Sequence, residues 1–484
     1  MKTCHKVLFL LVLVLTSTVL GDWSITDQQW YAVSIDGVKS GWAQEVVETK
    51  DARIKTSTVQ FMTLSRGGME LSIKVTSEFV ETEDGEPVSV STSQEAMGQV
   101  QTSEWLFKDG EIQMTSEAGG MPIIKRVPTP KEIWLTPQEK KELFIQKMKE
   151  GAATITYQTM TPELGPSIVT VVMTKMSDET KNVLGKPMVV TAWETVNDKM
   201  PVIGTEFYTS DGLHVGSSMN AGFGAITNTI ARRDEALAPV VEVPELMVSL
   251  FVEPNKKIDS AESILRMRLT SKDNSKVILP STGYQVATQN DDGSATLVVD
   301  LNKPVEATAV ELETDYLESS AICDSTDVQV RQIAQDAIMH LPEDSAQFEI
   351  ALALRKKVYE HITEKNMSKA FGSASQTARS QEGDCTEHGV LLCALLRASN
   401  IPSRGVMGMV YVPTMGGKNG VFGWHMWSQA LINGKWMDLD ATLDVPYTVG
   451  HIATMTTRLS DDEMAVEMAG IMNSIGNLEV EVID

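Results

Sequence analysis

The sequence predicts an α+β protein in which a long, β-rich antiparallel part precedes a shorter part where helices pack on a small antiparallel sheet. Three patterns carry this prediction. Residues 30–230 alternate polar and apolar side chains between Asp-Gly pairs, which favour hairpin turns. Residues 327–365 have apolar side chains at helical spacing. Asn433-Gly434, another strong hairpin signal, then joins two short strand patterns.

The composition indicates a globular protein. The chain has 484 residues, of which 42% are hydrophobic and 22% charged, enough for two or three domains with their own cores. The formal net charge is −24, and the sequence contains no cluster of lysine or arginine residues. We therefore expect no nucleic-acid partner and no anionic membrane surface as a partner.

Residues 1–21 have the pattern of a secretory signal peptide. Lys2 and Lys6 precede an apolar run of about 14 residues, and small residues precede Asp22. The run is shorter than the roughly 20 residues of a spanning helix, which argues against an uncleaved anchor. We expect cleavage, a secreted or periplasmic protein, and no membrane insertion beyond the signal segment.

Residues 22–236 are expected to form the β-rich antiparallel domain. Within it, Thr136 and Glu139 make a capping box and Pro137 takes the first position of a helix that ends before Gly151. Hairpin turns are expected at the Asp-Gly pairs 36–37, 84–85, 109–110 and 211–212.

A proline-containing run near residues 236–245 indicates a domain boundary. Residues 245–322 are predicted to form a smaller β unit, with strand patterns at 246–252 and 295–299. Residues 325–484 form the predicted C-terminal domain. It opens with helices over 327–341 and 344–365, the second with Asp344 as its N-cap.

Outside the signal, the chain has three cysteines: Cys323, Cys385 and Cys393. Three is odd, so at least one thiol stays unpaired in a monomer. If Cys385 and Cys393 share a helix they lie about 12 Å apart, beyond the roughly 7 Å limit for a disulfide. A Cys385–Cys393 disulfide is therefore excluded on that helix, and a Cys323–Cys393 disulfide stays open.

Cys385 is predicted to be the first residue of a helix. Asp384 suits the N-cap position, and Glu387 completes a capping box. A thiol there lies beside free backbone N–H groups at the positive end of the helix dipole. This position lowers a thiol's pKa and offers an oxyanion site. Cys385 is the candidate nucleophile, and the alternative is a buried structural cysteine.

The hairpin around Asn433-Gly434 supplies the partners of this cysteine. With a two-residue turn, Asp440 faces Trp427 across the ladder, and His425 lies two residues back on the same face, about 7–8 Å away at Cβ or somewhat less. His425 is the predicted base and Asp440 its orienting carboxylate. Asp438 projects from the same face but farther from His425. A bulged three-residue loop would break this parity.

Five sequence blocks resemble the transglutaminase-like superfamily, papain-like in chemistry, and its secreted bacterial members in particular. The blocks are Gly383–His388, Leu395–Ala398, Ile401–Gly405, His425–Trp427 and Trp436–Thr442. The resemblance covers about residues 325–455. It implies that 325–484 is a catalytic domain with a cysteine helix packed on a small antiparallel sheet, and that Cys385, His425 and Asp440 form a triad.

Two residues depart from the usual family pattern. Ala441 stands where proline commonly follows the triad aspartate, and Met426 stands where alanine commonly follows the histidine. Both leave the reactive groups intact, so they put loop shape and substrate entry in question more than the chemistry.

Other residues are weaker candidates. His388 and His451 are minor alternatives for the base, and Gln376 and Gln381 are side-chain oxyanion donors by residue type alone. The histidines do not pair at metal-ligand spacing, so we expect no metal and no cofactor. Residues 412–424 are interpreted as a flexible loop, a long turn rather than a lid.

The sequence therefore favours an exported acyl-transfer enzyme that attacks peptide or carboxamide bonds through a thioester on Cys385. Its expected partner is a peptide or protein substrate. Water as acceptor makes it a protease or amidase, and an amine makes it a transglutaminase. The alternative is a non-catalytic binding or scaffold protein that retains the same core.

Overall fold

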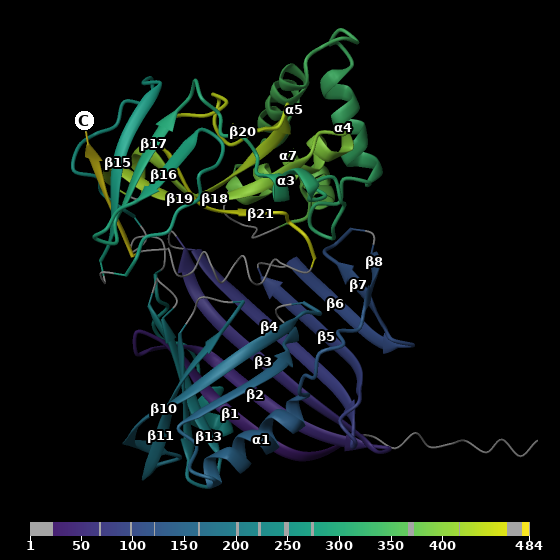
Figure 1. Ribbon diagram of the computed structural model, residues 1–484, viewed down its shortest axis with the longest axis vertical. Coiled ribbons are helices and arrows are strands. Elements are labelled where there is room, and N and C mark those ends of the chain that lie inside the picture. Colours follow the sequence, from purple (N-terminus) through teal and green to yellow (C-terminus); the bar gives the residue numbers. More distant parts are fainter. Residues whose placement is uncertain are drawn as a thin grey trace, which may run out of the picture.

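The computed structural model describes residues 23–66, 69–96, 99–120, 122–162, 165–199, 203–220, 224–245, 251–272, 275–365, 372–415, 417–461 and 477–483. The predicted signal peptide lies outside them. Within them, the α+β fold predicted from the sequence is confirmed: a large antiparallel sheet comes first, and helices with two small sheets follow (Figure 1). None of the described helices is long and apolar enough to cross a membrane.

The first part is a 14-stranded antiparallel sheet with the order β8-β7-β6-β5-β4-β3-β2-β1-β14-β13-β12-β11-β10-β9. All four predicted Asp-Gly turns join neighbouring strands of this sheet. Its strands are β1 (Ser24–Ile35), β2 (Val38–Lys50), β3 (Arg53–Arg66), β4 (Met69–Thr82), β5 (Pro87–Ala96), β6 (Gln99–Lys108), β7 (Glu111–Glu117), β8 (Ile123–Pro128), β9 (Thr154–Met160), β10 (Ile168–Val183), β11 (Lys186–Asn197), β12 (Gly204–Thr209), β13 (His214–Asn220) and β14 (Ala225–Ala231).

Helix α1 (Pro137–Lys149) connects β8 to β9 and begins with the predicted capping box of Thr136 and Glu139. Its Phe144 packs edge-on against Trp193 and contacts the ring of Tyr208, so α1 covers the β9–β12 end of the sheet. The short α2 (Arg233–Ala236) follows β14.

The second part is a four-stranded sheet of β15 (Ile264–Ser271), β16 (Gln285–Gln289), β17 (Ala295–Asp300) and β22 (Leu478–Ile483), in the order β16-β17-β15-β22. The strand predicted over 295–299 is present as β17. Residues 246–250 of the other predicted strand lie outside the described residues. Strand β22 belongs to the segment assigned by sequence to the C-terminal domain, yet it pairs with β15.

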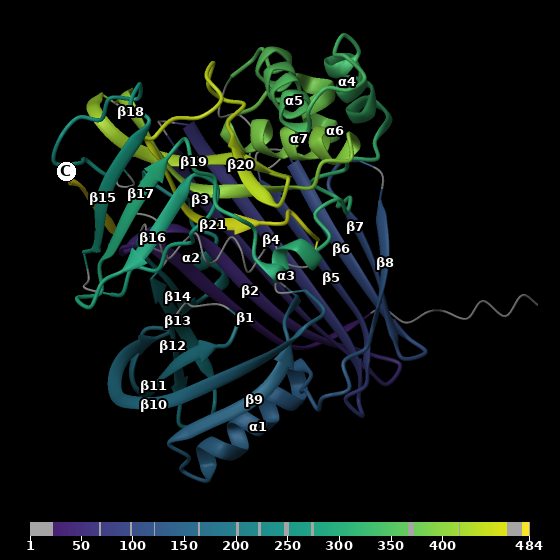
Figure 2. The same cartoon turned by 45° about the horizontal axis from the view of Figure 1, so that its top comes forward.

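The third part holds the helices α3 (Ala309–Glu313), α4 (Val328–Ile338), α5 (Gln347–His361), α6 (Ala374–Ser380) and α7 (Cys385–Ala398), with the sheet β20 (Lys435–Leu439), β19 (Lys418–Ile432), β18 (Ser403–Met415) and β21 (His451–Thr457) in the order β20-β19-β18-β21. Helix α7 is buried along nearly its whole length. It lies between the sheet and helices α4, α5 and α6 (Figure 2).

The long β18–β19 hairpin belongs to two hydrophobic cores. Met407 and Met426 join the core with α4, α5 and α7, whereas Met409 and Phe422 join the core with the small β15–β17 sheet. This correction concerns residues 412–424, which sequence analysis interpreted as a flexible loop. The strands pair as far as Met415↔Lys418, and Phe422 packs into the core of the small sheet.

A second correction concerns the start of α5. The helix begins at Gln347 with Ala346 as its N-cap, not Asp344. The Ala346 N–H donates to Glu349 Oε2 at 3.1 Å. The preceding residues form a turn closed by the Ser345 N–H on the Pro342 carbonyl at 3.1 Å. The bond from the Ala346 N–H to Glu349, which is one half of a capping box, therefore marks the start of the helix.

Candidate active site

Cys385 is the first residue of α7, as predicted. Asp384 Oδ1 accepts from the Thr386 N–H at 2.9 Å, and Glu387 Oε2 accepts from the Asp384 N–H at 2.9 Å. The predicted capping box is therefore confirmed. Cys385 is 8% exposed, so little of it reaches solvent. All three cysteines in the described residues are unbridged, which rules out the Cys323–Cys393 disulfide here.

The carboxyl group of Glu387 ties this helix start to the segment before α6. Glu387 Oε1 accepts from the Gly372 N–H at 2.8 Å. Burial and the nearby Asp384 raise the pKa of Glu387 to about 7, although hydrogen bonds from the backbone N–H groups of Gly372 and Asp384 oppose the shift. A Cβ at Gly383 would lie 2.3 Å from the Cβ of Glu387, so glycine lets the chain pass close to the cap.

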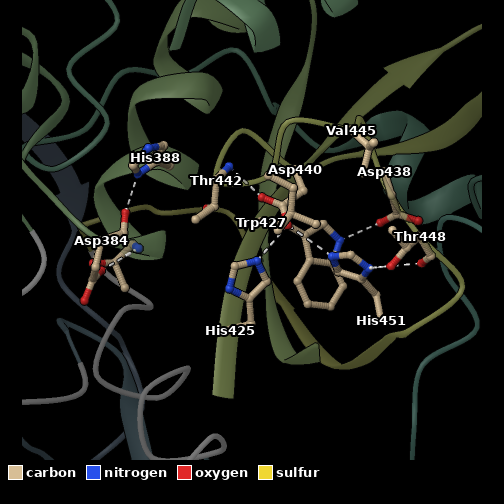
Figure 3. Close-up of polar contacts among 12 residues, drawn as sticks. Asp384, His388, His425, Trp427, Asp438, Asp440, Thr442, Val445, Thr448 and His451 are labelled. Carbon is tan, nitrogen blue, oxygen red and sulfur yellow. Dashed lines mark hydrogen bonds and ion pairs between the residues drawn. The ribbon is translucent and has the colours of Figure 1, made fainter. Parts of the chain in front are cut away.

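The β19–β20 hairpin has the predicted register. Ser428 faces Leu439 and Ile432 faces Lys435 around the two-residue turn of Asn433 and Gly434. Both turn residues have positive φ, 52° and 73°, as a type I′ turn requires. This register brings His425 and Asp440 together, with 2.8 Å between His425 Nε2 and Asp440 Oδ2 (Figure 3).

The side chain of Cys385 also interacts with this imidazole. Burial favours neutral His425, but the Asp440 charge and hydrogen bonds with Asp440 and Cys385 outweigh burial and raise the pKa of His425 to about 10. Because Nε2 is bound to Asp440, Nδ1 is the nitrogen left for the sulfur of Cys385. The structure thus gathers Cys385, His425 and Asp440 from α7, β19 and the segment after β20.

Asp440 is fully buried and fixed by several donors. Besides His425, the His451 imidazole lies with its Nε2 3.1 Å from Oδ2, and the Thr442 N–H donates to Oδ1 at 2.7 Å. Burial alone would raise the pKa of Asp440, but His425 and His451 hold that pKa well below its usual range. The group is therefore a buried anion between two imidazoles.

Asp438 takes no part in this contact. Its Oδ1 accepts from Trp427 Nε1 at 2.8 Å and from Gln429 Nε2 at 2.7 Å, and its Oδ2 accepts from the Tyr284 N–H at 2.8 Å. These donors hold it in the interface with the small β sheet, although burial raises its pKa. Asp440, and not Asp438, is therefore the carboxylate beside His425, as the hairpin register predicts.

Sequence analysis missed Arg355, which holds the segment after Asp440. From α5, its Nε donates to the Asp440 carbonyl at 2.7 Å, and its two terminal nitrogens donate to the carbonyls of Leu443, Asp444 and Val445. The residue is 5% exposed. No signal in the sequence separates it from Lys356 and Lys357, which follow it on the same helix.

Arg355→Met is expected to lower the free energy of unfolding by about 3–4 kcal/mol, since the buried Asp440 carbonyl and three partly buried contacts lose a charged donor at once. Urea unfolding of the variant measures the loss. Lys356→Met is the matched control. The Lys356 side chain, next to Arg355 in the sequence, is 71% exposed, so the free energy of unfolding should change by no more than about 0.5 kcal/mol. Equal stabilities for the two variants would contradict the role of Arg355.

The weaker candidates have other contacts. His388 Nδ1 donates to the Asp384 carbonyl at 2.6 Å, and burial lowers the pKa of His388 to about 4, which leaves it neutral. Gln376 Oε1 accepts from the Ser373 N–H at 3.0 Å, and Gly119, which lies between β7 and β8, packs close to its Nε2. Gln381 is exposed and ends α6 with a φ of 58°.

Among the described residues, His425, Asp440 and His451 place their ligand atoms within 4.8 Å of one another, a set whose chemistry could hold a metal ion. However, both imidazoles direct Nε2 at the same oxygen, Asp440 Oδ2. In a metal site, by contrast, the three ligand atoms point at the metal ion and not at one another. The arrangement fits N–H donors sharing a carboxylate better than it fits a metal site.

Residues 332–441 match the family model of the Transglutaminase-like superfamily. The transglutaminase-like segment begins inside α4 and ends just after Asp440, so it contains all three predicted site residues. The match confirms the resemblance found in the sequence, and it supports a cysteine-dependent enzyme as the kind of protein.

Three solved structures are similar to parts of the chain. A candidate cysteine protease from Cytophaga hutchinsonii is 16% identical, with 48% of this chain and 82% of that chain covered and a TM-score of 0.28. A beta-barrel-like protein from Brucella abortus is 12% identical, with coverages of 42% and 94% and a TM-score of 0.32. The periplasmic domain of TgpA from Pseudomonas aeruginosa is 14% identical, with coverages of 40% and 75% and a TM-score of 0.26. The search of curated proteins gave no match.

Proposed function

We propose that the protein is an exported acyl-transfer enzyme that attacks peptide or carboxamide bonds and forms a thioester on Cys385. The observation that carries the proposal is the continuous series of contacts from the Cys385 thiol through His425 to the buried Asp440 carboxylate. A thiol, a base and an orienting anion in this order are the groups that nucleophilic acyl transfer requires. The signal-peptide pattern of residues 1–21 supports export.

In the first half-reaction, His425 Nδ1 takes the thiol proton, and the resulting thiolate of Cys385 attacks the carbonyl carbon. The Cys385 N–H, in the first turn of α7 where amides lack intrahelical partners, donates to the developing oxyanion. His425 then returns the proton to the departing amine as the C–N bond breaks. A thioester remains on Cys385.

In the second half-reaction, an acceptor replaces the amine. His425 removes a proton from water or from a primary amine, the acceptor attacks the thioester carbon, and the proton returns to the Cys385 sulfur. Water gives hydrolysis and an amine gives transamidation. Throughout both steps Asp440 keeps Nε2 protonated, so that Nδ1 stays free to accept protons.

Trapping of the acyl-enzyme from a peptide library tests this function. The native protein is incubated with peptides, quenched in acid, and digested, and mass spectrometry locates the acyl group. We expect the adduct on Cys385, and its faster loss with added primary amine would identify the amine as acceptor. Cys393→Ala serves as a matched control that keeps the adduct. Peptide binding without any adduct would favour the scaffold alternative.

A further inference from the structure

His451, which the proposed reaction does not use, shares the buried oxygen that orients the base. Its Nε2 lies 3.1 Å from Asp440 Oδ2, the same atom that lies 2.8 Å from His425 Nε2 (Figure 3). Both His451 and Asp440 are fully buried. Solvent therefore cannot replace either partner in this contact.

Hydrogen-bond chemistry fixes which atom donates. A carboxylate with its pKa held far down is acceptor-only, so His451 Nε2 must carry a hydrogen. On the other side, Nδ1 lies 3.0 Å from the Thr448 carbonyl and 3.1 Å from the Thr448 hydroxyl. It either donates to the carbonyl or accepts from the hydroxyl. In both cases the Nε2–H donates to Asp440.

The ring of His451 is held in place by its neighbours. It stacks on Tyr447 with 4.1 Å between ring centroids and meets Trp427 edge-on at 5.1 Å. His451 opens β21, whereas Asp440 follows β20, and β19 and β18 lie between these two edge strands. The contact therefore ties the end of β20 to the opposite edge of the sheet.

We propose that His451 is a positioning residue that holds the Asp440 carboxylate in line with His425. The proposal rests on the proposed function, because it matters only if His425 serves Cys385. With the donor from His451 removed, the carboxylate keeps only the Thr442 N–H and His425 as donors, so it is held less firmly as the counter-ion of the His425 imidazolium. The thiolate of Cys385 then loses its own partner.

The titratable groups around this contact come from several elements. His425 lies on β19, Asp438 on β20, Asp440 and Tyr447 in the segment between β20 and β21, Arg355 on α5, Lys365 after α5 and Cys385 on α7. Substitution of His451 changes none of these groups directly, so a shift in the titration of Cys385 is traced to the lost imidazole and its N–H donor.

The test compares His451→Phe with His451→Gln in the full chain. Phenylalanine keeps an aromatic ring between Tyr447 and Trp427 but has no donor. Glutamine loses the ring but can place an amide N–H near the former position of Nε2. The readout is the rate at which iodoacetamide alkylates Cys385, measured by peptide mass spectrometry from pH 5 to pH 10, with melting temperatures to confirm that both variants fold.

We expect the acid limb of this profile to move up by about one pH unit in His451→Phe, which lowers the rates on that limb by up to about tenfold and leaves the rate at pH 9.5 unchanged. His451→Gln should keep most of the low-pH rate. Were the ring merely structural, the glutamine variant would suffer more than the phenylalanine variant. A lower rate in the glutamine variant than in the phenylalanine variant, or an unshifted acid limb in His451→Phe, overturns the inference about His451 but leaves the proposed function standing. A native protein without low-pH reactivity overturns the proposed function as well.

Discussion

Cys385→Ala is expected to abolish thioester formation, with acyl-enzyme reduced by at least about 10⁴-fold, because no second nucleophile of the described residues lies beside His425. Cys323 and Cys393 are fully buried, and burial raises the pKa of both thiols, to about 12 for Cys323. Neither has the environment of a reactive thiol. Mass spectrometry of the trapped adduct measures the loss.

Fold controls accompany this experiment. Alanine at position 385 keeps the helix start, since Asp384 and Glu387 make the cap, so the melting temperature should change little. An acyl group that moves to Cys323 or Cys393 in the variant would contradict the assignment of Cys385. An undiminished total yield would do the same.

Asp440→Asn is expected to lower the rate of acylation by about 10³- to 10⁴-fold while the fold persists. If the asparagine keeps its Oδ1 on the Thr442 N–H, its NH₂ takes the place of Oδ2. The NH₂ group then faces the Nε2–H donors of His425 and His451, so donor meets donor. His425 responds by moving its hydrogen to Nδ1. In that tautomer Nδ1 cannot take the proton of Cys385.

The same variant changes how stability depends on pH. The pKa of His425 is raised from 6.5 to about 10, so its pairing stabilises the native fold fully below pH 6.5 and is lost as pH rises through about 10. The lowered pKa of Asp440 adds stability above pH 3.8 that is lost as pH falls. Urea unfolding should show both contributions in the native protein, whereas in Asp440→Asn the Asp440 contribution is absent and the His425 contribution is reduced.

Asp438→Asn is the matched control for this prediction. Asp438 is a buried carboxyl on the same hairpin, bound to Trp427 and Gln429 and not to His425. Its substitution should cost stability through those contacts yet leave acylation within about tenfold of native. A similar loss of acylation in both variants would mean that Asp440 has no special place in the reaction.

The sequence predicts the candidate site well because local rules decide most of it. A capping box fixes where α7 begins, and the Asn433-Gly434 turn fixes the register that sets Asp440 beside His425. Both signals lie within a few residues of the groups that they place. The four Asp-Gly turns of the large sheet are predictable for the same reason.

Features that depend on contacts between residues far apart in the chain could not be predicted from the sequence. Arg355 and the carbonyls that it binds are about 85–90 residues apart, and nothing local separates it from two neighbouring lysines. Strand β22 pairs with β15 across some 200 residues, so its sheet cannot be read from the pattern alone. His451 has no unusual neighbours in sequence, and its role follows from the path of the chain between β20 and β21.

The most direct test of the account is the pH dependence of alkylation at each of the three cysteines in the native protein, followed by peptide mass spectrometry with iodoacetamide. A thiol that shares its proton with His425 is expected to react rapidly at pH 6, and Cys323 and Cys393 are expected to stay unlabelled until the protein unfolds. Labelling of Cys385 that begins only near pH 8.5, the ordinary midpoint of a thiol, would contradict the account.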